Sequence, residues 1–349
     1  MKILDRYIAA TVIGATLTAL AVLLALYTFL TFIEELDGSV LMALAHTVLT
    51  IPGWTNDLFP VAALLGGLLG LGRLASSSEL TVMRAAGYSL GRITRAVFAG
   101  GLVLMLVVVL LGELVAPRTD AMAEQLDSGE SGEALRLPSG DVWLRADEHV
   151  VHARRVPAVD RLDDVTVYTE ADDGQLASAL HADSAHHDPD TGWRLKGVAR
   201  TTFGDARLAT RTADDMAWPG GPDPGVLELV AADPERLGIV ELRAYIDYLR
   251  ANDLNSDAAE LTFWRKLAAP LTTAGMLMLA LPFVMGSLRT VSVGTRTFIG
   301  TLVGIGFFLF NHGFGNLSVV YGLAPFWGAF VPTIAVFVVA GIMASRIRG

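Results

Sequence analysis

The sequence predicts an α-helical membrane protein with six transmembrane helices and a β domain inserted between the third and the fourth. Six long apolar stretches fall in two groups of three, and a membrane-spanning helix needs about 20 such residues. A polar block separates the groups, and its apolar residues alternate over short runs, as in β-strands. The uncharged stretches are 7–33, 58–72, 96–112, 267–288 and 297–345; the last contains His312 and breaks at 321–325.

Composition narrows the class. The 349 residues include 35 glycines, some of them four apart, as at Gly300 and Gly304, and this spacing lets helices pack closely in a membrane. We expect such packing within the chain; a contact between subunits is the alternative. The absence of cysteine excludes disulfides and thiolate metal sites. The first span is too long for a signal peptide and lacks a small-x-small cleavage site, so we expect it to be retained.

Lys and Arg residues predict the orientation of the spans, because they gather in loops on the cytoplasmic side of a membrane. Both termini and the loops 73–95 and 289–296 are basic, whereas the loops 34–50 and 321–325 contain no Lys or Arg. We therefore expect cytoplasmic termini in a bacterial inner membrane and a periplasmic polar block. That block is acidic, which argues against nucleic-acid binding.

Short alternating runs in residues 118–236 predict a small β-sandwich or jelly roll. Asp-Pro-Asp-Thr-Gly at 188–192 predicts a turn between two strands, and a helical period in 237–262 predicts a connecting helix. The His and Asp residues of 181–190 match no defined metal-site spacing, so we expect a polar loop and no metal site. The predicted strands include 142–144, 150–153, 165–168, 193–198 and 207–210.

The loop 73–95 is predicted to contain a short helix at about 77–87. Ser76 to Glu79 form a capping-box pattern, apolar residues follow at helical spacing, and Gly87 is a natural stop. A cytoplasmic helix that exposes apolar side chains suits docking to a separate ATPase; a helix on the membrane surface is the alternative. The residues expected at the ATPase contact are Ser78, Glu79, Leu80, Val82, Met83 and Arg84.

No catalytic residues are predicted, since the chain has no P-loop, H-E-x-x-H or G-x-S-x-G motif. We expect no enzyme activity and no cofactor in this chain. Ion-coupled carriers place ionisable residues deep in their spans, where Asp57 and His312 are the candidates here. We expect Asp57 to lie at the membrane interface and His312 to form an interhelical hydrogen bond. An ion-coupled lipid carrier and a non-transporting scaffold are the alternative functions.

Several segments resemble one known family. Leu-Asp-Arg-Tyr-Ile opens the chain at 4–8, Phe-Pro-Val-Ala-Ala-Leu-Leu-Gly-Gly begins at 59, and Ser-Glu-Leu-Thr-Val-Met-Arg-Ala-Ala-Gly occupies 78–87. Gly-Glu-Leu-Val-Ala-Pro closes the third span at 112–117, and Val-Val-Tyr-Gly the fifth at 319–322. In these segments the chain is similar to the LptF/LptG family of lipopolysaccharide export permeases, more so to its LptG branch. The likeness covers essentially the whole chain and is most specific over 59–87.

The resemblance implies a permease subunit of an ABC-type exporter, with six spans and a periplasmic β-jelly roll. Its partners would be an LptF-like paralogue, an LptC-like single-span protein and an LptB-like ATPase dimer, which would bind ATP and magnesium. The assembly would extract lipopolysaccharide from the inner membrane and pass it to a periplasmic bridge. The helix at 78–87 would be the coupling helix, with Glu79 at the ATPase.

The resemblance also implies lateral gates on the first and fifth spans. Family members carry lysines near the first two spans, where this chain has Glu-Glu-Leu-Asp at 34–37 and Pro-Gly-Trp at 52–54. Lipid phosphates are therefore expected at other basic residues, at the partner, or through divalent cations; a snorkelling interfacial position is the alternative for each arginine. The expected lipid-binding residues are Arg118, Arg136, Arg265, Lys266, Phe307 and Phe310. The expected gate residues are Gly304, Gly306, Asn311 and His312, with Gly313 and Gly315 beside them.

Overall fold

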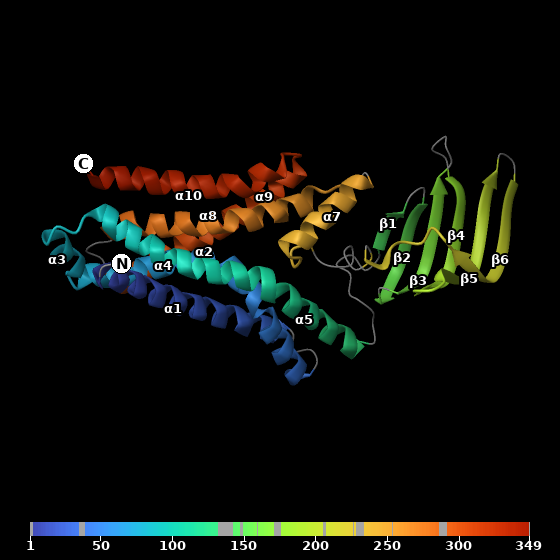
Figure 1. The fold of residues 1–349 in the computed structure, drawn as a ribbon, viewed down its shortest axis with the longest axis horizontal. Helices are drawn as coiled ribbons and strands as arrows, with labels where there is room; N and C mark the ends of the chain where they lie inside the picture. Colours follow the sequence, from blue (N-terminus) through green and yellow to red (C-terminus); the bar gives the residue numbers. More distant parts are fainter. Residues whose placement is uncertain are drawn as a thin grey trace. The chain divides into compact units, whose positions relative to one another are not determined.

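The computed structural model describes residues 3–34, 39–131, 142–146, 149–158, 160–170, 176–204, 207–225, 227, 234–252, 254–285 and 292–348. The chain divides into two compact units (Figure 1). A helical unit comprises Met1–Asp120 and Asp257–Gly349, and a β unit comprises Ala121–Ser256. The β unit is therefore an insertion into the helical unit.

Six helices among the described residues are long and apolar enough to cross a membrane, which confirms the predicted number of spans. The third candidate span combines α4 (Leu90–Leu110), the π-helical turn η1 (Leu111–Val115) and the start of α5 (Ala116–Ser131). The other five are α1 (Ile3–Glu34), α2 (Val40–Ser76), α8 (Asp257–Met285), α9 (Val293–Val320) and α10 (Pro325–Arg348).

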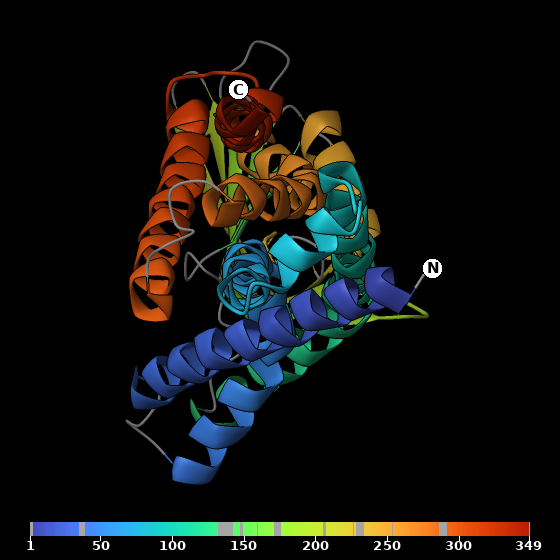
Figure 2. The ribbon, with the colours of Figure 1, turned by 90° about the vertical axis from the view of Figure 1, so that its left-hand side faces the viewer.

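Helix α2 is the centre of the helical unit. In the most apolar stretch of α2, 78% of the residues are buried, against 17% in the most apolar stretch of α9. Figure 2 shows α2 in light blue, nearly end-on, between α1 in dark blue and α8 in orange. The main core joins the three helices, and its fully buried side chains include Ile8, Leu64, Leu68, Leu71 and Met276.

Glycines bring α2 close to both neighbours. A Cβ atom at Gly66 would overlap the backbone of Thr16 on α1, and one at Gly67 would lie 2.7 Å from Cβ of Ala280 on α8. Such approach allows van der Waals contact between helix backbones, which drives helix association in a membrane. At these positions, as at Gly304 against Val61, the small residues pack within the chain, as expected.

The β unit contains one antiparallel sheet of six strands, in which each strand pairs with its neighbour in the sequence (Figure 1). The inserted antiparallel β domain is thereby confirmed. The strand order, which the sequence left open, is consecutive. The strands are β1 (Val142–Ala146), β2 (His149–Ala158), β3 (Arg161–Glu170), β4 (Leu176–Asp188), β5 (Gly192–Gly204) and β6 (Arg207–Trp218).

Alternation between buried and exposed residues is interrupted at one level of the sheet. Asp164, Asp183 and Gly197 lie opposite one another on β3, β4 and β5. In each of these strands two residues, instead of the usual one, separate the buried residues on either side of this level. Asp164 and Gly197 have positive φ, and the pairing register runs through this level without a shift. Buried residues on the two sides of this level are Leu162 and Val165, Ala182 and Ala185, and Leu195 and Val198.

The polar residues of 181–190 were expected in a loop, and this expectation is wrong for most of them. They belong to β4, where His181, Asp183 and His186 are exposed and alternate with buried Leu180 and Ala182. Polar residues on the exposed side of a strand and small residues on the other give a weak strand signal. His181 lies 3.7 Å from the carboxylate of Asp164.

The predicted turn and connecting helix are both present. The backbone N–H groups of Asp190 and Thr191 donate to Asp188 Oδ1 at 2.8 and 3.2 Å, and these bonds lower the pKa of Asp188. Helix α7 (Ile239–Ala251) buries one face, as its period predicts. That face consists of Leu242, Ile246 and Leu249.

The close approach of α1 and α2 gives a test by matched substitution. Gly66→Ala should lower the free energy of unfolding by about 1–3 kcal/mol, the usual cost of overpacking. Gly14→Ala, on α1, places its methyl group where no atom lies within 4 Å, so it should be neutral or stabilising. Thermal midpoints of the two purified variants check this, and equal midpoints would contradict the close contact.

Candidate functional site

Helix α3 (Glu79–Ala85) follows α2 directly and is the short helix predicted in this loop. Leu80 and Met83 are buried in the main core, whereas Val82 is 66% exposed and Arg84 is also exposed. The prediction that Leu80 and Met83 are exposed is therefore wrong, because they lie three residues apart on the face that packs inward. The exposed face is narrower than expected.

The N-terminal end of α3 differs from the prediction, whereas its C-terminal end agrees with it. The capping box is absent: Ser76 and Ser77 donate to the carbonyl of Arg73, and the N-cap residue Ser78 has φ of 61° and makes no side-chain cap bond. At the other end Gly87 has φ of 85°, and the N–H of Tyr88 donates to the carbonyl of Met83 at 2.9 Å. This is a Schellman-type end, so the stop at Gly87 is confirmed.

Glu79 binds the first turns of α1. The Tyr7 hydroxyl donates to Glu79 Oε2 at 2.9 Å, and the Ser77 hydroxyl donates to Oε1 at 2.8 Å. A second contact lies just beyond α3, where the Tyr88 hydroxyl donates to Asp5. Burial, together with this hydrogen bond, raises the pKa of Tyr88, which keeps its hydroxyl protonated and able to donate.

Arg265 links α8 to α9. Its Nη2 atom lies 3.4 and 3.2 Å from the carbonyl oxygens of Asn311 and His312, and 3.3 Å from Asn316 Oδ1. Gly315 provides the space, because a Cβ atom there would overlap the guanidinium. The positive charge therefore meets helix carbonyls across a helix–helix contact, an arrangement typical of ionisable groups in membrane spans.

Two of the other predicted basic residues, Lys266 and Arg118, also have partners within the chain. Lys266 Nζ lies 3.9 Å from a carboxylate oxygen of Glu113, which stands in the π-helical turn η1. Arg118 Nη1 donates to the carbonyl of Leu114 at 2.6 Å. Arg136 lies outside the described residues. Lipid binding by these residues stays a prediction, and each described one would have to exchange a present contact for a phosphate.

The predicted residues of α9 fall on two sides of the helix. Gly304 packs against Val61 of α2, and Phe307 packs against the main core. Gly306, Phe310 and His312 are exposed in this chain. The carbonyl of Asn311 belongs to the Arg265 contact. The structure therefore brings Asn311 and His312, two predicted gate residues, into contact with Arg265, a predicted lipid-binding residue.

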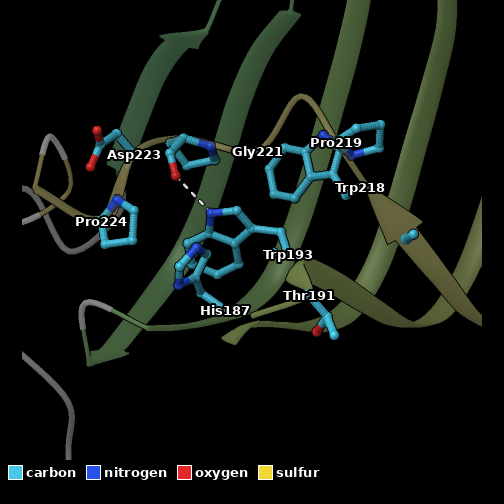
Figure 3. Close-up of a pocket in the computed structure, with 11 residues that line it drawn as sticks. His187, Thr191, Trp193, Trp218, Pro219, Gly221, Asp223 and Pro224 are labelled. Atoms are coloured by element: carbon cyan, nitrogen blue, oxygen red, sulfur yellow. Dashed lines mark hydrogen bonds between the residues drawn. The ribbon is translucent and has the colours of Figure 1, made fainter. Parts of the chain in front are cut away.

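The β unit contains a pocket that the sequence did not indicate (Figure 3). Its volume is about 580 Å³, and the Trp193 indole N–H donates to the carbonyl of Pro222 at 2.6 Å in its wall. The sequence feature that could have indicated this pocket is the run of prolines and glycines that follows β6. The lining consists of His187, Thr191, Gly192, Trp193, Ala217, Trp218, Pro219, Gly221, Pro222, Asp223 and Pro224.

The contact of Arg265 with α9 generates a second prediction. Arg265→Met should lower the free energy of unfolding by about 1 kcal/mol, because interhelical polar contacts in membranes contribute about that much. Gly315→Ala should act similarly by displacing the guanidinium, whereas Gly306→Ala, with no atom within 4 Å, should not. Thermal midpoints check stability, and spin-label distances between Thr262 and Leu317 should broaden only in the first two variants. A wild-type distribution in Arg265→Met would contradict the link.

Comparison with known proteins agrees with this architecture. The family model "Lipopolysaccharide export system permease LptF/LptG" matches residues 6–346. The chain is 35% identical to the lipopolysaccharide export system permease protein LptG of Haemophilus influenzae, covering 99% of both chains. It is 32% identical to the LptG protein of Escherichia coli K12, covering 97% of this chain and 96% of that one. The chain therefore belongs to the LptF/LptG family, with its closer likeness to LptG.

Proposed function

We propose that this chain is the permease subunit of an ABC-type exporter that extracts lipopolysaccharide from the bacterial inner membrane and passes it to a periplasmic bridge. The observation that carries the proposal is the full-length similarity to LptG permeases, together with six apolar helices and an inserted β unit. The distribution of Lys and Arg supports cytoplasmic termini and a periplasmic β unit.

Helix α3 is proposed to dock to a separate ATPase. Its inward face is fixed by Leu80 and Met83 in the main core, so α3 is joined firmly to α2. Val82 and Arg84 are both exposed, on different sides of the helix. An exposed apolar side chain on a rigidly held helix suits a small docking surface. ATP and magnesium would bind in that partner, an LptB-like dimer, and hydrolysis there would supply the work.

An LptF-like paralogue and an LptC-like single-span protein are proposed as the membrane partners. Helices α1 and α9 are less buried in this chain than α2, and they expose large apolar side chains that either lipid or a partner helix could cover. Those on α1 and α9 include Leu26, Phe29, Leu30, Phe298, Leu302 and Leu309. These two helices are the proposed lateral gates, each formed together with a helix of the LptF-like partner, and the acyl chains of the lipid would enter there.

Lys266 is the residue best placed to meet a lipid phosphate. Its distance of 3.9 Å to Glu113 is longer than a charge-assisted hydrogen bond, so a phosphate oxygen would replace a weak contact there. Arg265 would have to give up contacts to three acceptors on α9. Phe310, exposed on α9, is proposed to contact acyl chains.

The docking proposal can be tested by a charge on the exposed face of α3. Val82→Glu should abolish co-purification of the ATPase and ATP-dependent release of lipopolysaccharide from proteoliposomes that contain this chain, its two membrane partners and the ATPase. Val240→Glu makes the same change at an exposed valine of α7 in the β unit and should leave both readouts intact. Release without the ATPase would favour an ion-coupled carrier, and normal export with Val82→Glu would favour a scaffold; either result would contradict the proposal.

A further inference from the structure

The first turns of α1 are fastened to both ends of α3 by polar contacts. At the first residue of α3, Glu79 accepts hydrogen bonds from Tyr7 and from Ser77. After α3, Asp5 accepts a hydrogen bond from Tyr88. Asp5 also lies 3.5 Å from Nε of Arg92 at the start of α4. Two positions on α1, two residues apart, therefore hold two points that bracket α3.

The second point is reinforced by stacking. The guanidinium of Arg92 lies 4.6 Å from the centre of the Tyr88 ring, within the range of a cation–π interaction. Tyr88 is buried, and its backbone N–H closes the end of α3 on Met83. The Asp5 contact therefore reaches a residue whose position is set by α3 itself.

An apolar core underlies these polar contacts. Ile8 and Val12 of α1 are fully buried in the same cluster that holds Leu80 and Met83 of α3. The polar contacts hold α1 and α3 together at the surface. The apolar core holds the same two helices together beneath it. A displacement of α3 would have to break both sets of contacts or carry the N-terminal end of α1 with it.

We propose that the contacts of Glu79 with Tyr7, and of Asp5 with Tyr88 and Arg92, transmit the movement of the coupling helix α3 to the gate helix α1. This inference rests on the proposed function, because it concerns how the work of a partner ATPase reaches a gate in this chain. Glu79 thereby acts as a positioning residue within the chain. A role limited to direct contact with the ATPase is the opposing explanation.

Tyr7→Phe separates the two explanations. It removes only the hydroxyl, and the ring is 45% exposed, so the fold should be unaffected. It substitutes no residue of α3, so the surface that α3 offers to the ATPase and the binding of the ATPase should be unchanged. Lipopolysaccharide released per ATP hydrolysed should fall about threefold to tenfold, the scale on which mutations within coupling networks act. Tyr321→Phe makes the same change at a 76% exposed tyrosine and should leave this ratio at the wild-type value.

Variants of Glu79 add a second readout. Glu79→Gln keeps an oxygen that accepts from Tyr7 or Ser77, so it should retain most of the coupling that Glu79→Ala loses. If Glu79→Gln fails like Glu79→Ala while Tyr7→Phe behaves as wild type, the charge meets the ATPase directly and the inference is overturned. A wild-type ratio of lipid to ATP in Tyr7→Phe overturns it as well.

The inference can also be judged without transport. The chain has no cysteine, so spin labels at Ala10 on α1 and Val82 on α3, both exposed, report on the two helices alone. Tyr7→Phe should broaden their distance distribution in the purified chain, and an unchanged distribution overturns the inference. If the wild-type assembly shows no ATP-dependent release while the distribution broadens, the proposed function fails and the mechanical link stands.

Discussion

The packing of α2 between α1 and α8 is the contact on which the helical unit depends. Apolar side chains gain little by leaving lipid, so the helices must be held by close backbone approach. Gly66 and Gly67 provide that approach on two sides of α2. Since α3 continues directly from α2 and buries Leu80 and Met83 in the same core, the proposed docking surface takes its position from this packing.

The two proposed gate helices carry polar contacts in addition to their glycine contacts with α2. Besides apolar packing, α1 is held by carboxylates that accept from tyrosines, and α9 by a guanidinium that donates to backbone carbonyls. Hydrogen bonds can exchange partners, whereas interlocked glycine surfaces cannot move apart without losing their contact. Helix α1 meets α2 through Gly66, and α9 meets it through Gly304, so either gate helix would have to exchange its polar contacts and slide along this glycine packing in order to move.

The spans and the inserted β domain were predictable because long uncharged runs and short alternation are strong signals. The interruption of the alternation at the level of Asp164, Asp183 and Gly197 was not, since it shifts the buried positions by one residue in each of three strands. The predicted strand at 165–168 accordingly begins where that level ends. In the site, α3 could be located from its sequence, whereas its buried face could not. The contact of Arg265 was also hidden, because its acceptors are largely backbone carbonyls, which every sequence contains.

The consecutive strand order has a consequence for biosynthesis. Each strand of the β unit pairs with the strand made just before it, and such local contacts form quickly. The unit occupies one continuous stretch, Ala121–Ser256, whereas the helical unit needs both ends of the chain. The sheet can therefore assemble hairpin by hairpin as it emerges, before α8 has been synthesised. Until α8 has been synthesised, the surface of α2 at Gly67 lacks its partner helix. The nascent chain then has a folded β unit and an incomplete helical unit. A membrane insertase would have to protect the exposed surface of α2 at this stage.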